Sequence, residues 1–277
     1  WILSSEGSFL SSDIAKELKL SSRVDMKNFS KILSRLVEEG IIEREGKRRG
    51  SFRCINDDCP EIDWSSAPTD SIDILFPLGI EELVKIMPGN LVIIAGVSNA
   101  GKTGFLLNFI RRNMHRHNVH YFSSEGGAEE HHLRLNEFPP EEGTGRPIDW
   151  KHHFYERSDN FQDVIRPDDV NIIDFLELHD EFYRIGGILS AIHSKLNNGI
   201  AVIAIQKNPG AVHGLGGARS IEKARLYLSL EPGKCTIRKA KILRDKAVNP
   251  NGLSIGFKIA NGCTIIPSKT GWLREEV

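Results

Sequence analysis

The chain has 277 residues, with 36 Lys and Arg against 37 Asp and Glu, which gives a formal net charge of −1. Its 40% hydrophobic and 26% charged residues are ordinary for a folded protein and exclude a largely disordered chain. The length predicts about two domains, because one domain usually holds about 100–150 residues.

Two further function classes are disfavoured by composition. The apolar runs are far shorter than the about 20 residues of a bilayer span, so we expect no membrane association. Only four cysteines occur, which is too few for a disulfide scaffold. A reducing, cytoplasmic setting is therefore expected.

Residues 1–56 predict a small α+β domain. Apolar residues at helical spacing indicate one helix near residues 14–18 and another over 29–37. Residues 41–53 have the pattern of two strands joined by a basic turn that contains Lys47, Arg48 and Arg49. This order resembles a winged helix-turn-helix domain, which places its second helix in the major groove of DNA and its wing on phosphate. Two interpretations stay open: duplex DNA contact through the basic turn, or docking onto a protein with the turn in solvent.

Residues 57–75 are polar and rich in turn-forming residues, and we interpret them as a linker. From residue 76 to residue 277, short apolar runs alternate with helical stretches. The clearest runs are 91–95, 119–122, 171–174 and 201–205. Strands separated by helices predict an α/β domain with a central, mostly parallel sheet.

A glycine-rich motif follows the first of these strands and opens an apolar helix. It fits G-x4-G-K-[ST], the pattern of a phosphate-binding loop, in which backbone N–H groups and a helix N-terminus surround phosphate. In such a loop the lysine reaches the β- and γ-phosphates and the Thr hydroxyl binds Mg2+. We assign to ATP binding the residues Gly96, Val97, Ser98, Asn99, Ala100, Gly101, Lys102, Thr103 and Gly104.

Acidic residues follow two other strands of this domain. The apolar run 171–174 ends in Asp174, which is suited to hold the water shell of Mg2+, so Thr103 and Asp174 are the expected metal residues. The run 119–123 is followed by Glu125, which is positioned to activate an attacking water.

With these motifs, residues 76–262 resemble the RecA-like ATPase core, and within it the DnaB-type helicase branch (superfamily 4). The resemblance rests on the P-loop, on the segment 76–89 that precedes it, and on three motifs that occur in the family's order. Those motifs are Tyr121-Phe122-Ser123-Ser124-Glu125 with Arg134 further on, Ile173-Asp174-Phe175-Leu176-Glu177-Leu178, and Val202-Ile203-Ala204-Ile205-Gln206.

The resemblance implies a role for each matching residue. Glu125 would be the catalytic base, Asp174 the Mg2+-associated acid, Arg134 a nucleotide-site residue and Gln206 the sensor of the γ-phosphate. In this family the loop after Gln206, here residues 207–220, lines the path of single-stranded DNA. Lys207 and Arg219 are the expected DNA contacts of that loop.

A trans-acting basic residue is implied near residues 240–244, although the spacing departs from the family's Lys-x-Arg. Lys241 and Arg244 are three apart, which places them on opposite faces of an extended strand. We choose Arg244 as the finger that completes a neighbour's site, and Lys241 or Lys246 remains open as its partner.

The resemblance predicts a DNA-dependent ATPase that acts in replication, recombination or repair on single-stranded DNA. It implies ATP and Mg2+ as cofactors, and a homo-oligomer, either a hexameric ring or a filament, with nucleotide at subunit interfaces. The alternative is a regulator, in which the winged helix binds duplex DNA and the core is a nucleotide-gated switch or assembly module.

The near-neutral total charge conceals opposed blocks. Residues 44–53 carry five basic residues and one acidic residue, a sum of +4, and residues 205–258 carry eleven and three, a sum of +8. Residues 125–185 carry six basic and sixteen acidic residues, a sum of −10. Both basic blocks coincide with the segments expected to meet nucleic acid, so the total of −1 does not exclude a polyanionic partner.

Overall fold

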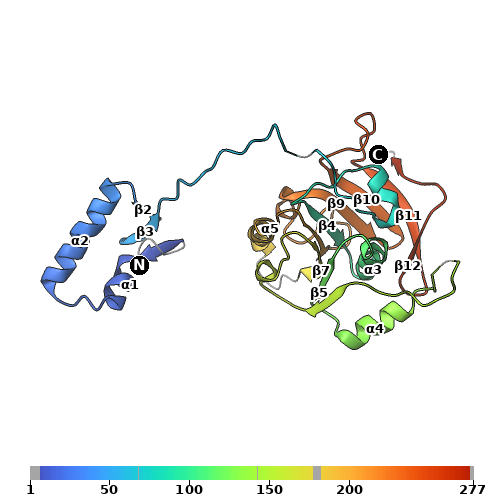
Figure 1. The fold of residues 1–277 in the computed structure, drawn as a ribbon, viewed down its shortest axis with the longest axis horizontal. Helices are drawn as coiled ribbons and strands as arrows, with labels where there is room; N and C mark the ends of the chain where they lie inside the picture. The colour runs from blue at the N-terminus through green and yellow to red at the C-terminus, as the bar shows by residue number, and fades with distance from the viewer. Residues whose placement is uncertain (1–6, 68, 142, 177–181, 275–277) are drawn as a thin grey trace. The chain divides into compact units, whose positions relative to one another are not determined.

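The computed structural model describes residues 7–67, 69–141, 143–176 and 182–274. The chain divides into two compact units, Trp1–Pro68 and Thr69–Val277 (Figure 1). None of the helices in the described ranges combines the length and the apolar character of a bilayer span.

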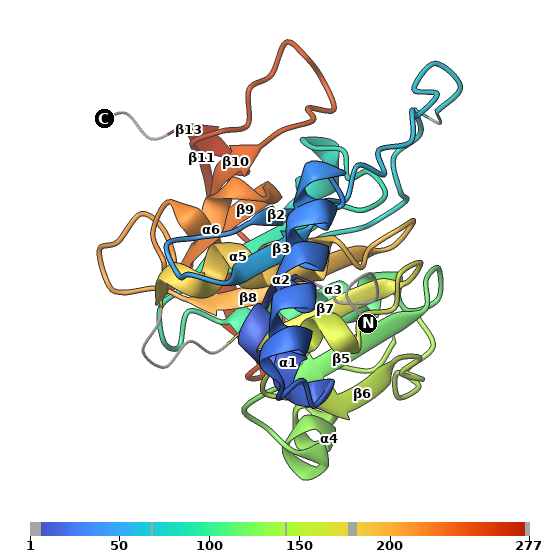
Figure 2. The same cartoon turned by 90° about the vertical axis from the view of Figure 1, so that its left-hand side faces the viewer.

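The N-terminal unit consists of two helices and a small antiparallel sheet with the strand order β1-β3-β2. Phe29 and Leu33 of the long helix are buried in one core cluster with Ile42 and Phe52 of the sheet, and Figure 2 shows this helix along its length. The Ser22 side chain accepts a hydrogen bond from an N–H of the first turn and so caps this helix. The elements are β1 (Ser8–Leu10), α1 (Ser11–Glu17), α2 (Arg23–Glu38), β2 (Ile42–Arg44) and β3 (Ser51–Cys54).

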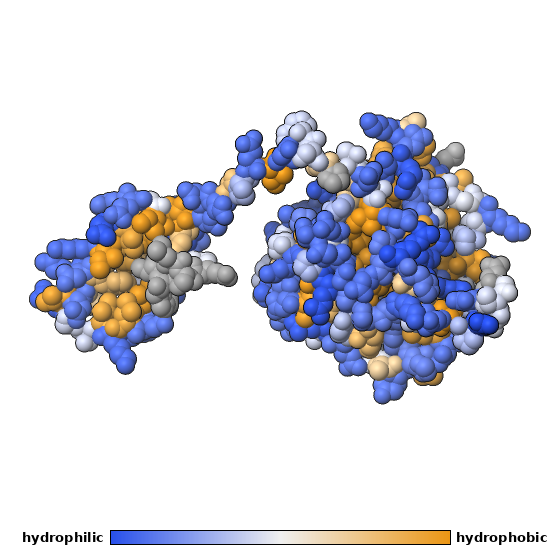
Figure 3. Space-filling view, in the orientation of Figure 1, coloured by the Kyte–Doolittle hydropathy of each residue, from blue (hydrophilic) through white to orange (hydrophobic). Residues whose placement is uncertain are grey.

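The surface of the N-terminal unit combines charge with apolar side chains. The turn between β2 and β3 carries Lys47, Arg48 and Arg49, and all three are exposed. Apolar side chains also reach the surface of this unit (Figure 3), where α2 contributes the exposed Val24 and Met26.

The second unit is built on a ten-stranded sheet with the order β12-β11-β10-β9-β4-β8-β7-β5-β6, and β13 pairs with β11. The six strands from β9 to β6 are parallel, whereas β10, β11, β12 and β13 pair antiparallel. The strands are β4 (Leu91–Gly96), β5 (Val119–Ser123), β6 (His153–Glu156), β7 (Val170–Leu176), β8 (Ile200–Gln206), β9 (Ala224–Glu231), β10 (Lys234–Ala240), β11 (Leu253–Ala260), β12 (Thr264–Pro267) and β13 (Leu273–Arg274). The helices are η2 (Pro77–Glu82), α3 (Lys102–Asn113), α4 (Ala128–Asn136), η3 (Phe161–Asp163), η4 (Phe182–Arg184), α5 (Ile185–His193) and α6 (Arg219–Glu222).

Helices cover both faces of the parallel strands, with α3 on one side and α5 on the other (Figure 1). Alternate residues of β4 point to opposite faces, so that Val92 and Ile94 pack with α3, and Leu91 and Ile93 pack with α5. All four are completely buried. Strands buried on both faces are continuous apolar runs, which is why the sequence pattern predicts them correctly.

The second unit begins at Thr69, within the segment 57–75 that the sequence predicts to be a linker. Ile74 is buried in the core beside α3, and the Ile72 N–H donates to the Ile86 carbonyl at 2.8 Å. The buried Asn113 side chain binds both backbone groups of Leu75, with the N–H donating at 2.9 Å and the carbonyl accepting at 2.7 Å. Residues 69–75, which we expected to be linker, therefore belong to the second unit, and the prediction of a linker over 57–75 is wrong for them.

Gly199, directly before β8, tests the close packing of this residue against the backbone of residues 168–169, which precede β7. A Cβ there would overlap the backbone of Asp168 and Asp169, so Gly199→Ala is expected to lower the free energy of unfolding by about 1–3 kcal/mol. Gly187 lies within α5 with open space around it, and Gly187→Ala should raise that energy by up to about 1 kcal/mol. Urea denaturation measures both variants, and equal stability of Gly199→Ala and the wild type would contradict the packing described.

Candidate active site

The register of the parallel strands brings four predicted site segments to one edge of the sheet. Gly96 at the end of β4 lies beside Gln206 at the end of β8. Asp174 in β7 lies beside Ser123 at the end of β5, so the loop carrying Glu125 starts next to Asp174. Because all four strands run in the same direction, their carboxyl ends meet at this edge, where ligands of open α/β sheets bind.

The P-loop turns tightly between β4 and α3. Asn99 and Gly101 have positive φ values of 59° and 89°, and Gly101 precedes the first helical residue, Lys102. The Lys102 ammonium donates to the loop carbonyls of Gly96 at 3.3 Å and Val97 at 3.2 Å. The loop thus places its lysine at the N-terminus of a helix, where the helix dipole favours an anion.

Two carboxylates and one amide surround this ammonium. Lys102 donates to the Gln206 side-chain oxygen at 3.0 Å. Burial lowers the pKa of Lys102, and the nearby charges of Asp174 and Glu125 oppose that shift. The structure therefore brings Lys102, Gln206, Asp174 and Glu125 together.

Asp174 is the most enclosed acidic group of the site, with 4% of its surface exposed. Burial raises the pKa of this carboxyl, and the neighbouring hydroxyls of Tyr121 and Thr103, followed by Lys102, oppose the rise. Tyr121 donates to Asp174 Oδ2 at 2.6 Å, whereas Oδ1 has no hydrogen-bond partner among the described residues. A buried carboxylate oxygen without a partner, next to a Thr hydroxyl, suits the water shell of Mg2+.

Within the described ranges, no group of three or more His, Cys, Asp or Glu side chains is arranged to hold a metal ion by itself. Mg2+ usually binds through one or two protein groups together with waters and phosphate oxygens. Thr103 and Asp174 are thus suited to hold Mg2+ only together with nucleotide phosphates.

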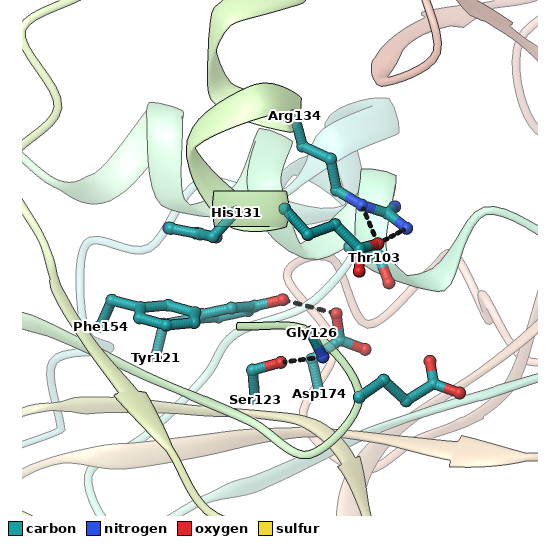
Figure 4. A pocket seen from close by; sticks show the side chains of 10 residues that line it. Thr103, Tyr121, Ser123, Gly126, His131, Arg134, Phe154 and Asp174 are labelled. Carbon is teal, nitrogen blue, oxygen red and sulfur yellow. Dashed lines mark hydrogen bonds and ion pairs between the residues drawn. The ribbon is translucent and has the colours of Figure 1, made fainter. Parts of the chain in front are cut away.

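Glu125 lies on the exposed turn between β5 and α4. The Gly126 N–H donates to the Ser123 hydroxyl at 3.1 Å and shapes this turn. The turn borders a pocket at the edge of the sheet (Figure 4). The pocket is lined by Thr103, Tyr121, Ser123, Glu125, Gly126, Glu130, His131, Arg134, Phe154 and Asp174.

Arg134 reaches this pocket from α4 and binds Glu130 one helical turn earlier. Its Nε and Nη2 donate to the same Glu130 oxygen at 3.0 and 2.6 Å. Because α4 carries both residues, the guanidinium is held over the pocket that Thr103 and Asp174 line (Figure 4).

Lys207 is not available to nucleic acid, contrary to the prediction from its loop. Its side chain is completely buried and donates to Ser229 Oγ at 2.8 Å and to Glu231 Oε1 at 2.9 Å, both on β9. Its backbone N–H donates to the Gly96 carbonyl at 3.0 Å. The lysine thus fastens the start of the loop 207–220 to the sheet, and its ammonium does not reach solvent.

The other predicted basic residues lie outside the pocket. Arg219 is exposed at the start of α6 and donates to the Tyr183 carbonyl at 3.3 Å. Arg244 is exposed and donates to the Glu81 carbonyl at 2.7 Å. Since β10 runs antiparallel to β9, it leads toward the amino ends of the parallel strands, so Arg244 is remote from the site of its own chain.

Sequence reasoning missed one residue that the site uses. In the sequence Tyr121 is only one member of a motif, and its bond to Asp174 depends on how two strands distant in sequence pair. The alternation of β5, which directs Tyr121 to the helix-α3 side of the sheet, was the available signal. Two motif residues, Glu177 and Leu178, lie outside the described residues.

Comparison with known proteins identifies the fold alone. No protein-family model matches the chain, and no curated protein sequence is significantly similar to it. A KaiC-like protein from the hyperthermophilic archaeon Pyrococcus horikoshii OT3 is 18% identical, with a TM-score of 0.52, over 73% of this chain and 100% of that chain. The RadB recombinase is 14% identical, with a TM-score of 0.46, over 65% of this chain and 90% of that chain. The chain therefore has a RecA-like fold, a mixed α/β fold with a large and mostly parallel sheet.

Proposed function

We propose that this protein is an ATPase that hydrolyses ATP at the P-loop site and acts on DNA. The observation that carries the proposal is the arrangement at the edge of the sheet. There Lys102 binds Gln206 and is flanked by the charges of Asp174 and Glu125. Phosphoryl transfer to water requires a cation on the phosphates, a base, an acid near Mg2+ and a polar sensor. These four groups lie here around one helix N-terminus.

Each residue has a distinct task in this reaction. The backbone of residues 96–104 and the Lys102 ammonium bind the phosphates, so the ammonium exchanges the Gly96 and Val97 carbonyls for phosphate oxygens. Glu125 accepts a proton from the attacking water. Gln206, held beside the P-loop by the pairing of β4 and β8, contacts the γ-phosphate and senses its loss.

Thr103 and Asp174 would hold Mg2+ with the nucleotide, Thr103 through its hydroxyl and Asp174 through Oδ1, which has no hydrogen-bond partner among the residues that the structure describes. When bound, Mg2+ neutralises charge that develops on the phosphate oxygens. Arg134 adds a positive charge over the same pocket and orients the phosphates.

Single-stranded DNA is the proposed partner of the core, with the loop after Gln206 and the exposed Arg219 as its contact. Gln206 and this loop are contiguous, so a change in the γ-phosphate reaches the loop directly. The test is steady-state phosphate release with and without a single-stranded oligonucleotide. We expect stimulation by the oligonucleotide, and unchanged turnover with no DNA retention at low salt would refute the DNA-dependent function.

The position of Arg244 supports a proposal that several copies assemble. Because it lies far from the site of its own chain, it can contribute to phosphoryl transfer only at the site of a neighbouring copy. We propose a homo-oligomer, ring or filament, with ATP between copies, and electron microscopy with a non-hydrolysable ATP analogue distinguishes the two forms.

A second candidate function is favoured by the exposed basic turn of the N-terminal unit. If this unit is a winged helix, Lys47, Arg48 and Arg49 bind duplex DNA and the core acts as a nucleotide-gated regulator.

Replacing Lys47, Arg48 and Arg49 together with alanine separates the two functions. The regulator would lose about 10²-fold or more in duplex affinity at low salt, because three phosphate-facing cations are removed. If the protein is instead a DNA-dependent ATPase, single-stranded DNA should still stimulate its ATP turnover. Fluorescence anisotropy and phosphate release measure the two properties on the same preparation.

A further inference from the structure

Tyr121 contacts the Asp174 carboxylate, and its hydroxyl is directed into the protein. The side chain is 2% exposed, and its Oη donates to Asp174 Oδ2 at 2.6 Å. With Asp174 ionised, this is a charge-assisted hydrogen bond, which is stronger than one between neutral groups. It occupies one carboxylate oxygen and leaves Oδ1 free of hydrogen bonds from the described residues (Figure 4).

The ring of Tyr121 is held by two other rings. His131 of α4 stacks on it with centroids 5.2 Å apart, and Phe154 of β6 stacks at 5.8 Å. His131 and Phe154 also stack on one another at 4.2 Å, so the three rings form one block beside the carboxylate. A tyrosine packed in this way cannot turn its hydroxyl away from Asp174 without disturbing α4 and β6.

A histidine pair fixes the outer side of this block. His131 Nε2 and His152 Nε2 are 2.8 Å apart, and burial lowers the pKa of each imidazole to about 4. Both imidazoles are therefore neutral near pH 7, and one donates a hydrogen bond to the other. The pair ties α4 to the segment before β6 and keeps His131 stacked on Tyr121.

We propose that Tyr121 is a positioning residue for Mg2+: its hydroxyl fixes the Asp174 carboxylate so that Oδ1 faces the metal's water shell. The inference rests on the proposed function, because it assigns Tyr121 a role in the same Mg2+–ATP site. Tyr121 touches neither nucleotide nor metal in this account, and acts only through Asp174.

The test compares Tyr121→Phe with the wild type by the affinity for a fluorescent, non-hydrolysable ATP analogue, in Mg2+ and in EDTA. The ratio of the two dissociation constants gives the gain in affinity due to Mg2+. Loss of one hydrogen bond to a charged group is expected to reduce this gain about tenfold. The dissociation constant in EDTA should not change, because Tyr121 does not contact the nucleotide.

Tyr155→Phe is the matched control, because its phenol lies on the neighbouring strand β6 and binds His120 at 3.2 Å instead of a site carboxylate. It should keep the full Mg2+ gain. An undiminished gain in Tyr121→Phe would overturn the inference, as would equal weakening in Mg2+ and EDTA, which indicates a structural role alone. A wild type with no Mg2+ gain would instead refute the proposed Mg2+–ATP site itself.

Discussion

Replacing Lys102 with alanine is expected to reduce ATP turnover by about 10³-fold, because the variant loses the cation that stabilises charge on the transferred phosphoryl group. The structure places the ammonium between the P-loop carbonyls and Gln206, within the influence of Asp174 and Glu125. The described pocket that begins at the next residue, Thr103, has no lysine in its lining that could replace Lys102. Phosphate release under saturating ATP measures the effect.

The control for this variant is Lys195→Ala, which removes an exposed lysine after α5. It should leave turnover within about twofold of the wild type, because surface substitutions away from a site have small effects. Turnover in Lys102→Ala equal to that of the control would show that hydrolysis does not occur at this P-loop.

Glu125→Gln should separate hydrolysis from binding. The amide cannot accept the proton of the attacking water, so turnover is expected to fall by about 10²–10⁴-fold. ATP binding should persist, since the P-loop, Lys102 and Thr103 remain. Isothermal titration calorimetry with a non-hydrolysable ATP analogue measures binding, and phosphate release measures hydrolysis.

Glu129→Gln is the matched substitution for this test, because Glu129 is exposed in the first turn of α4, four residues further along the chain. It should retain wild-type turnover. If Glu125→Gln hydrolyses ATP as fast as Glu129→Gln, Glu125 is not the base.

The P-loop residues and the four strand ends could be predicted from the sequence because their signals are local. A glycine-lysine pattern between an apolar strand and an apolar helix specifies its own geometry, and parallel strands bring their carboxyl ends together. Asp174, Gln206 and Glu125 needed no knowledge of strand order, because Asp174 lies in a buried strand, Gln206 ends one and Glu125 follows one.

The features that the sequence did not reveal depend on contacts between distant segments. Lys207 resembles a solvent-facing loop lysine until β9 places Ser229 and Glu231 beside it. Ile72 and Ile74 belong to a segment too short for a periodic pattern, and Asn113 anchors it from the far end of α3. A sum of charges along a segment likewise cannot tell a buried lysine from an exposed one.

Mg2+-dependent ATP hydrolysis at the P-loop is best tested by single-turnover phosphate release. Wild-type protein in excess over γ-labelled ATP is mixed with Mg2+ or with EDTA, in the presence of single-stranded DNA. We expect release of phosphate with Mg2+ and none with EDTA. Absence of release in both conditions, with the protein folded and the ATP intact, would contradict it.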